Sequence, residues 1–355
     1  MTAFQDTLKH ATVLAIFSMC AVTTQVHAEP ISGLANKSDN PLTTEFTPPG
    51  KLIDIGGRKM QIDCRGTGSP TVVFESGLGN SGSLDWSFVH DTIAKTTRAC
   101  AYSRAGIMWS EPHVAQQVGK SVAEDLHALL AHAGEKGPFV LVGHSLGGPY
   151  SMIFTKYFTA EVAGLVFVDS SHPDQLMAFD NVVAKYRSLP FLGKTLLPAR
   201  KILTGFNQLQ TVLSIVLSYA PVSEIAAQTE YEALGQTLAE AGSFRRLGRR
   251  PIIVLTAQAP LSPQERAFGG ETPEQHERER GKFKLLRTDM ATWSSNSLHL
   301  LVPDAGHFIH IDRPDVVIAA VQSVVNSVRS HQPVKYEPGS KHHNHQGGYN
   351  AGHAY

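Results

Sequence analysis

The sequence has no excess of either charge, because 31 Lys and Arg residues balance 31 Asp and Glu residues. Nucleic-acid-binding domains normally carry a basic bias, so this balance argues against that class of partner. Hydrophobic residues make up 42% of the 355 residues and charged residues 17%. These proportions are ordinary for a globular protein with a sizeable core, and the length allows one large domain or two small ones.

Long apolar runs are also scarce. The stretch "ATVLAIFSMCAV" at residues 11–22 is too short to cross a bilayer, and small residues stand at the signal-peptidase positions Val26 and Ala28. Residues 1–28 are therefore predicted to be a secretory signal, with a buried N-terminal helix as the alternative. A lipoprotein signal through Cys20 is disfavoured, since Met19 stands where a small residue is expected. We expect a secreted or periplasmic protein with no stable membrane insertion.

Cysteine is rare as well, and removal of the signal leaves only Cys64 and Cys100. An even pair in an exported chain suggests a disulfide. The alternative is two unpaired thiols, which bury readily in a core.

The two ends of the mature chain differ from its middle. Residues 29–50 are polar and proline-rich, and are predicted to form an extended leader. Residues 331–355 are poor in apolar residues and are predicted to be a disordered tail. Four histidines near its end could hold a divalent metal loosely: His342, His343, His345 and His353. A solvated end is the preferred interpretation, because closed metal sites draw their ligands from a folded scaffold.

Between these ends, strand and helix patterns alternate from about residue 51 to 330. Strand patterns lie at 51–64, 70–77, 98–106, 139–143, 164–169, 251–258 and 298–307, and helix patterns at 85–97, 121–134, 272–293 and 313–330. This alternation predicts an α/β fold with a mostly parallel sheet and helices on both faces. The first strand pair reads as an antiparallel hairpin turned at Gly56 and Gly57. Ser121, with Glu124 three residues on, predicts a helix N-cap.

The segment Gly143–Gly147, "GHSLG", fits the pattern G-x-S-x-G between a strand and a helix. This context is typical of a nucleophile elbow, where a strained turn projects the hydroxyl of Ser145 beyond the sheet. The flanking glycines lack Cβ atoms, so the strand and the helix can approach closely. A plain glycine turn is the alternative interpretation.

A serine nucleophile needs a base, which should follow the last strand. His307 stands there, directly after Gly306. His310 is the alternative, and it otherwise reads as a packing or surface histidine, as does His299.

With these residues the chain resembles the α/β-hydrolase fold family over about residues 51–330. The resemblance lies in "GHSLG" (143–147), "AGHF" (305–308) and "ESGLG" (75–79). It implies an eight-stranded sheet, a helical cap, and a Ser-His-acid triad that works through an acyl-enzyme. No metal or cofactor is expected for this chemistry.

The triad acid departs from the commonest family pattern. The loop after the strand at 251–258 has no carboxylate until Glu265. A subset of the family carries the acid one strand earlier, and here Asp169 ends that strand. Asp169 is therefore the preferred acid, with Glu265 and then Asp304 as alternatives.

The resemblance also implies two backbone donors for the oxyanion. One is the N–H of Leu146, and the other is that of Leu78, after Gly77. Many relatives have His where this chain has Ser76, a departure that leaves the backbone donor in place.

Two further features follow from the family pattern. The strands that carry Cys64 and Cys100 are neighbours in that family, which favours the disulfide. A helical cap is expected at about residues 170–250, and its apolar stretch suggests a hydrophobic acyl or alcohol pocket.

Together these features predict an exported serine hydrolase that cleaves a small, apolar carboxylic ester. An amidase or aminopeptidase with the same triad is one alternative, and a catalytically inactive binding module is another. Epoxide hydrolase and dehalogenase activities are disfavoured, because those relatives carry an aspartate at the position of Ser145. The sequence does not indicate an oligomeric state.

Overall fold

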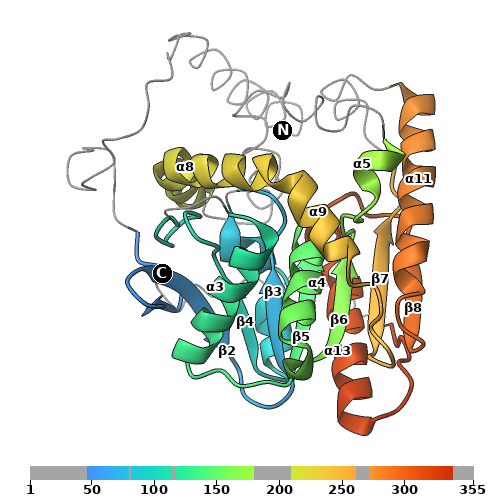
Figure 1. Cartoon of the computed structure of the whole chain (residues 1–355), viewed down its shortest axis with the longest axis horizontal. Helices are drawn as coiled ribbons and strands as arrows, with labels where there is room; N and C mark the ends of the chain where they lie inside the picture. Colours follow the sequence, from blue (N-terminus) through green and yellow to red (C-terminus); the bar gives the residue numbers. More distant parts are fainter. Residues whose placement is uncertain (1–45, 80, 114–116, 180–208, 261–271, 339–355) are drawn as a thin grey trace, which may run out of the picture. The chain divides into compact units, whose positions relative to one another are not determined.

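The computed structural model describes residues 46–338, apart from residue 80 and the segments 114–116, 180–208 and 261–271. Within them one eight-stranded sheet has the order β1-β2-β4-β3-β5-β6-β7-β8 (Figure 1). The strands are β1 (Lys51–Asp54), β2 (Lys59–Arg65), β3 (Thr71–Glu75), β4 (Ala99–Tyr102), β5 (Phe139–His144), β6 (Val162–Val168), β7 (Ile252–Ala257) and β8 (Ser297–Val302). The β1–β2 and β2–β4 pairs are antiparallel and all the others parallel. The predicted eight-stranded, mostly parallel sheet is confirmed.

The central strands are apolar throughout because both faces of the sheet are covered. In β3, Val73 packs into the core on one face, while Val72 and Phe74 pack into the core on the other. In β5, Leu141 likewise faces the first core and Val142 the second. This period of two assigns successive side chains to opposite layers.

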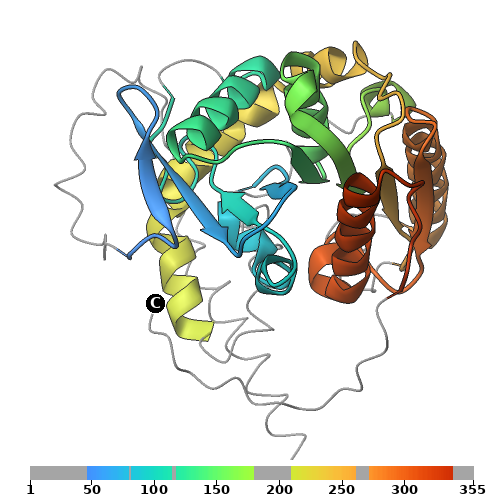
Figure 2. The same cartoon turned by 90° about the horizontal axis from the view of Figure 1, so that it is seen from below.

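Helices form the two outer layers (Figure 2). One layer holds α3 (Gly119–His132), α4 (Gly147–Tyr157) and α11 (Pro273–Ala291), and the other holds α2 (His90–Ala94) and α13 (Pro314–Ser330). Short elements complete the order: η1 (Gly82–Trp86), η2 (Thr159–Glu161) and α12 (Ile309–Asp312). The predicted helix at 85–97 is thus two shorter elements, η1 and α2.

Helix α3 has its N-cap three residues earlier than its sequence pattern suggested. Its N-cap is Val118, and Ser121 lies inside the first turn, where its hydroxyl contacts the Val118 backbone at N (3.1 Å) and O (2.8 Å). The predicted N-cap at Ser121 is therefore wrong. The hydroxyl still occupies one of the backbone groups that a helix start leaves open.

The chain between β6 and β7 contains α5 (Gln175–Ala178), α8 (Leu209–Glu232) and α9 (Leu234–Gly242). We call these helices the insertion helices. Helix α8 (yellow in Figure 1) contacts the loop that follows β4, where Ser223 Oγ accepts a 2.8 Å hydrogen bond from the Met108 N–H. This contact places α8 at the carboxyl end of β4. The bounds predicted for the cap, about 170–250, include 180–208, which lie outside the described residues.

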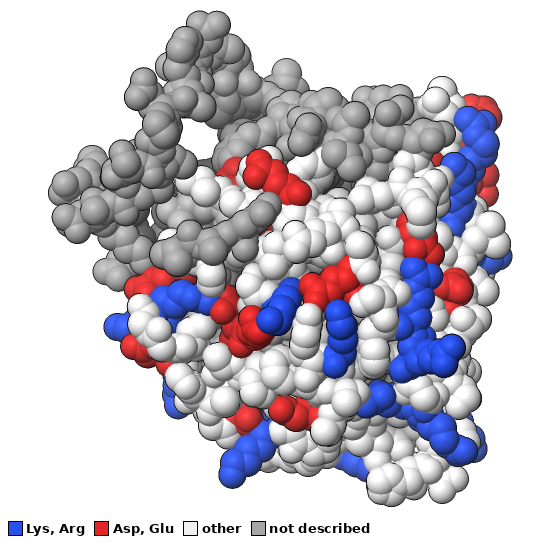
Figure 3. Space-filling view, in the orientation of Figure 1, with Lys and Arg blue, Asp and Glu red and all other residues white. Residues whose placement is uncertain are grey.

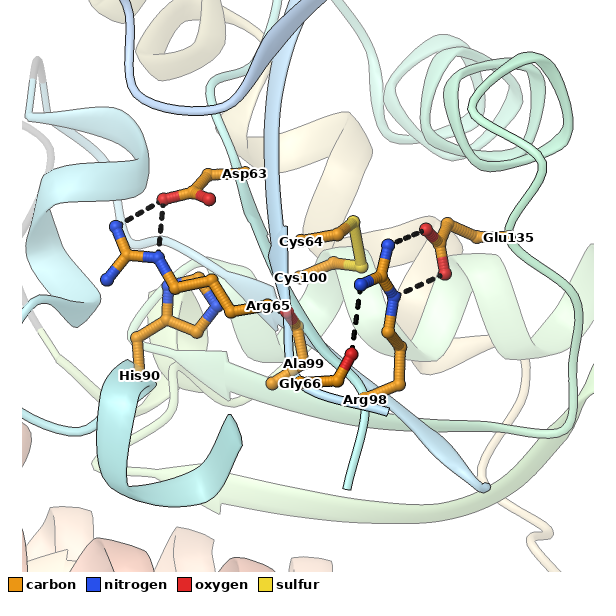
Figure 4. Close-up of a disulfide and its surroundings, with 9 residues drawn as sticks. All are labelled: Asp63, Cys64, Arg65, Gly66, His90, Arg98, Ala99, Cys100 and Glu135. Carbon is orange, nitrogen blue, oxygen red and sulfur yellow. Dashed lines mark hydrogen bonds and ion pairs between the residues drawn. A yellow bond between two sulfur atoms is a disulfide. The ribbon is translucent and has the colours of Figure 1, made fainter. Parts of the chain in front are cut away.

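The disulfide that the family pattern implied is present. Cys64 in β2 and Cys100 in β4 are direct partners across the strand pair, with an S–S distance of 2.08 Å (Figure 4). Glu135 lies beside the bridge and pairs with Arg98 at 2.6 Å. Because the two sulfurs are bonded to each other, they offer no thiolate to a metal.

The predicted signal and most of the predicted leader lie outside the described residues, as does the histidine cluster of the tail. Residues 331–338 continue past α13, and there Val334 is buried against the core and donates its N–H to Asn296 Oδ1 at 2.7 Å. Among the described residues, no helix has the length and apolarity needed to cross a membrane. Cationic and anionic side chains are interspersed on the face shown in Figure 3.

Candidate active site

Ser145 occupies a strained turn between β5 and α4. Its backbone has a φ of +51°, a left-handed conformation that non-glycine residues rarely adopt. Two backbone hydrogen bonds hold the turn: the Ser145 N–H donates to the Val168 carbonyl at 3.2 Å, and the Ser145 carbonyl accepts from the Gly148 N–H at 3.1 Å. The Ser145 residue remains half-buried. Its side chain therefore stands at the carboxyl edge of the sheet.

The glycines around Ser145 are required by close backbone contacts. A Cβ atom on Gly143 would lie 2.5 Å from the Gly147 carbonyl oxygen, and one on Gly147 would lie 2.2 Å from the Glu75 carbonyl oxygen. Both distances are too short for any side chain. The predicted reason for these glycines, a close approach of strand and helix, matches this geometry.

Asp169 follows β6 directly and is buried, with a φ of +43°. Its Oδ1 accepts a 2.8 Å hydrogen bond from the Ala257 N–H and pairs with Arg287 Nη1 at 2.8 Å. Its Oδ2 lies 2.7 Å from His307 Nδ1. Three elements, β6, β7 and α11, thus hold one carboxylate against the imidazole.

These contacts decide the charge of Asp169. Burial raises the pKa of a carboxyl, but the Arg287 guanidinium and the bonds from His307 and Ala257 outweigh burial and lower the pKa of Asp169. An ionised carboxylate only accepts hydrogen bonds, so Nδ1 of His307 carries the proton. In the neutral imidazole this tautomer keeps the lone pair on Nε2 of His307, as a base requires.

His144 joins His307 to the serine turn. His144 Nε2 lies 3.0 Å from the His307 carbonyl oxygen, and the two rings are 4.7 Å apart. Burial, followed by the neighbouring His310 and His307, holds the pKa of His144 well below its usual range. A neutral His144 therefore donates Nε2–H to the His307 backbone, which places His307 beside the residue that precedes Ser145.

The alternative bases and acids have other surroundings. His310 is buried beside Trp86, with ring centroids 4.8 Å apart, and His299 contacts the Thr256 hydroxyl at 2.9 Å. Asp304 pairs with Arg313 at the surface. Glu265 lies outside the described residues.

The loop after β3 approaches the serine closely. A Cβ on Gly77 would lie 2.9 Å from His144 Nδ1 and 3.0 Å from Ser145 Cβ. Ser76 is turned away, and its hydroxyl donates to the Gly82 carbonyl at 2.8 Å and accepts from Trp86 Nε1 at 3.1 Å. The presence of Ser76, where many relatives have His, therefore leaves the backbone of this loop in place beside Ser145.

Leu78 and Leu146, the predicted oxyanion donors, belong to one apolar cluster. Their side chains pack with residues of α4, α8 and α9, including Tyr150, Tyr231 and Leu238. Between the described residues, the backbone N–H groups of these two leucines donate no hydrogen bond. Both groups thus remain available to an acceptor.

The sequence interpretation missed three residues of this site: Arg287, His144 and Arg104. Arg287 lies in a helix whose sequence is charged throughout, so no pattern distinguishes it from its solvated neighbours. His144 stands inside "GHSLG", and Arg104, which bonds to the carbonyls of Ser76 and Gly77, follows β4. Arg104 is almost fully buried, and an arginine after an apolar strand could have indicated a buried partner.

Comparisons with known proteins agree with this architecture. Solved structures with a similar fold include a thermophilic esterase from Thermogutta terrifontis, with 21% identity and a TM-score of 0.54 over 76% of this chain and 94% of that one. The epoxide hydrolase CorEH has 16% identity and a TM-score of 0.53 over 79% of this chain and 98% of that one. At such identities the likeness shows the fold alone.

Among curated proteins, the uncharacterized protein YbdG of Bacillus subtilis (strain 168) is 26% identical over 131 residues. The match covers 37% of this chain and 40% of the length of YbdG. The uncharacterized protein YqjL of the same organism is 22% identical over 260 residues, covering 73% of this chain and 85% of YqjL. The sequence model of the alpha/beta hydrolase family matches residues 63–320, and the chain therefore belongs to that family.

Proposed function

We propose that this protein is an exported serine hydrolase that cleaves carboxylic esters through Ser145, His307 and Asp169. The observation that carries the proposal is the 2.7 Å bond between His307 Nδ1 and Asp169 Oδ2, beside a serine held at φ +51°. It matches the arrangement of a nucleophile, a base and an acid that orients the base. The thermophilic esterase with a similar fold is consistent with this class of reaction.

The proposed reaction has two halves. Ser145 Oγ attacks the acyl carbonyl while His307 Nε2 takes the hydroxyl proton, and Asp169 stabilises the imidazolium. The tetrahedral oxyanion accepts hydrogen bonds from the N–H groups of Leu78 and Leu146. His307 then donates its proton to the leaving alcohol, leaving an acyl-serine. In the second half, His307 takes a proton from water, the resulting hydroxide attacks the acyl group, and Ser145 leaves with the proton returned.

An apolar substrate is favoured by what surrounds the donors. The side chains of Leu78 and Leu146 contact an apolar cluster that the insertion helices complete with Leu176, Leu234 and Leu238. Such surroundings exclude water and suit a hydrophobic acyl or alcohol group. An epoxide hydrolase reaction is less well supported, because the attacking residue would have to be a carboxylate at the position of Ser145.

Export is part of the same proposal. The Cys64–Cys100 disulfide is compatible with an oxidising compartment, and the predicted signal at residues 1–28 would direct the chain there. Sequencing the N-terminus of protein recovered outside the cytoplasm tests this, and a start at Glu29 is expected. An N-terminus at Met1 in all of the protein would contradict it.

The catalytic proposal is tested by labelling with a fluorophosphonate probe and by a chain-length series of p-nitrophenyl esters run beside aryl amides. We expect the wild type to be labelled and to hydrolyse the esters, and Ser145→Ala to do neither. Hydrolysis of amides alone would replace the esterase with an amidase. If the wild type is not labelled by the probe and hydrolyses no more substrate than Ser145→Ala, the protein would be a binding module without catalytic activity.

A further inference from the structure

Arg104 is a buried arginine whose donors are fully used. It follows β4 and is 4% exposed. Two of its N–H groups bind the Glu230 carboxylate, from Nε to Oε1 at 2.7 Å and from Nη2 to Oε2 at 2.8 Å. The others bind Glu75 Oε1 at 2.8 Å and the carbonyls of Ser76 and Gly77, each at 2.7 Å. All five donors of the guanidinium are thus satisfied.

The bond to the Gly77 carbonyl has a direct consequence for its neighbour. The Gly77 carbonyl and the Leu78 N–H belong to one peptide unit, which is planar and trans, so the two groups point in opposite directions. Holding the carbonyl on Arg104 therefore fixes the direction of the Leu78 N–H. A charged donor on the carbonyl also polarises the peptide and strengthens its N–H as a donor.

Glu230 brings the insertion helices into this arrangement. It lies near the end of α8 and is fully buried, and both of its carboxylate oxygens accept hydrogen bonds from Arg104. Bidentate pairing fixes the plane of the guanidinium as well as its position. The plane of the guanidinium in turn determines where Nη1 and Nη2 meet the carbonyls of Ser76 and Gly77.

The charges of the cluster favour Glu230 as the counter-ion of Arg104. Two carboxylates face one guanidinium in a buried site, and Tyr102 also donates to Glu75. Burial raises the pKa of Glu75 to about 7, although Arg104 and the Tyr102 hydroxyl lower it. Near neutral pH a fraction of Glu75 is therefore protonated, whereas Glu230 contacts Arg104 with both of its oxygens.

A buried ion pair is not required for stability, since well-packed apolar residues often serve as well. Helix α8 also has other contacts with the loop after β4, which carries Arg104. Ala226 packs against Ile107 and Met108, and a Cβ on Gly106 would lie 2.7 Å from Ala226 Cβ. The Arg104–Glu230 pair adds to these contacts a link from α8 to the backbone carbonyls of Ser76 and Gly77.

We propose that Glu230 and Arg104 form a clamp that couples helix α8 to the loop at residues 76–79, which makes both of them positioning residues for the oxyanion donor at Leu78. The inference rests on the proposed function. It implies that helix α8 helps to complete the geometry in which the transition state is stabilised.

The test compares Glu230→Gln with Glu232→Gln, the same change two residues on, where the side chain is exposed and accepts a 3.0 Å hydrogen bond from Gln228 Nε2. We expect Glu230→Gln to lower kcat for a p-nitrophenyl ester by about tenfold or more, since each oxyanion donor contributes roughly 10²–10³. KM and the pH dependence of kcat should change little. The Ki of a trifluoromethyl ketone, which forms a tetrahedral adduct on the serine, should rise by the same factor. Glu232→Gln should match the wild type.

Hydrogen exchange of the peptide that contains residues 76–79 supplies a readout independent of catalysis. It should quicken in Glu230→Gln and not in Glu232→Gln. If this holds while the wild type cleaves no ester, the clamp stands and the proposed function fails. If Glu230→Gln matches Glu232→Gln in exchange, kcat and Ki, the clamp is overturned. Should Glu230→Gln not fold, Glu230→Asp keeps the charge and shortens the reach, and a folded Glu230→Asp with wild-type kcat and exchange overturns it equally.

Discussion

Arg287 Nη1 lies 2.8 Å from Asp169 Oδ1, on the side of the carboxylate opposite His307. Arg287 also donates from Nε to the Ser170 carbonyl at 3.0 Å and from Nη2 to the Asp169 carbonyl at 3.1 Å. One guanidinium thus fixes both the side chain and the backbone of Asp169. A carboxylate placed after β6 is held by α11, an element that follows β7.

Replacing Arg287 with Met should destabilise the protein by about 3–5 kcal/mol at pH 7, because a buried carboxylate then loses its cation. The present contacts lower the pKa of Asp169. The stability that they contribute is therefore complete above the unfolded pKa of 3.8 and is lost as the pH falls through the folded value. The deficit of Arg287→Met should accordingly shrink towards pH 3. Urea unfolding at several pH values measures it.

Arg278→Met is the matched control, since Arg278 is an exposed arginine on the same helix. Its unfolding free energy should stay within about 0.5 kcal/mol of the wild type. Equal effects of the two substitutions would show that the Arg287–Asp169 pair contributes nothing.

Asp169→Asn should lower kcat for an ester by roughly 10⁴, because an amide at this position favours the wrong tautomer of His307. Glu265→Gln should retain activity. Steady-state rates, measured where circular dichroism shows both variants folded, decide between the two acids. Loss of activity in Glu265→Gln alone would assign the acid to Glu265.

The fold was predictable because periodicity and motif spacing are local signals. Alternation of strands and helices predicted the sheet, and "GHSLG" predicted the turn at Ser145, where the observed φ is positive. The contacts of Arg287 and Glu230 were not predictable in this way. Both lie on helices, far along the chain from the residues that they bind, and nothing near them marks a buried charge.

The N-cap of α3 illustrates a finer limit. Ser121 fits the capping pattern by residue type, but the helix begins at Gly119, and Ile153 Cδ1 would lie 2.2 Å from a Cβ at that position. Tertiary packing of the first turn against α4 thus overrode the local preference. Helix ends are set by such contacts as much as by propensity.

Gly77→Ala should lower kcat for an ester by about 10-fold to 100-fold, since the added Cβ would lie 2.9 Å from His144 Nδ1 and 3.0 Å from Ser145 Cβ. The methyl group must displace the serine or the loop that carries Leu78. Gly281→Ala is the control, because a Cβ there on α11 meets nothing within 4 Å. It should keep full activity and gain up to about 1 kcal/mol of stability. Equal activity of the two variants would remove the steric argument for Gly77.

Two buried carboxyls, Asp85 and Glu75, should make the stability of the protein fall as the pH rises towards 7. Burial raises the pKa of Asp85 from 3.8 to about 7 and that of Glu75 from 4.5 to about 7. The nearby Arg104 lowers both pKa values, but burial outweighs it. Because the folded state binds these protons more tightly than the unfolded state, the stabilisation is complete below about pH 4 and is lost as the pH rises through 7. The free energy of unfolding should therefore fall between about pH 4 and pH 7 on account of these groups, and level off above that.

Asp85→Asn removes one of these groups at nearly constant volume. Between the described residues, Asp85 Oδ1 has no hydrogen-bond partner, so the amide gives up no bond at that atom. At pH 8 the variant should be more stable than the wild type by roughly 1–3 kcal/mol, and near pH 4 the difference should vanish. Asp91→Asn, at an exposed position, should leave the pH profile unchanged. Urea titrations at pH 4, 6 and 8 measure both variants, and a parallel profile for Asp85→Asn and the wild type would show that Asp85 is ionised throughout this range.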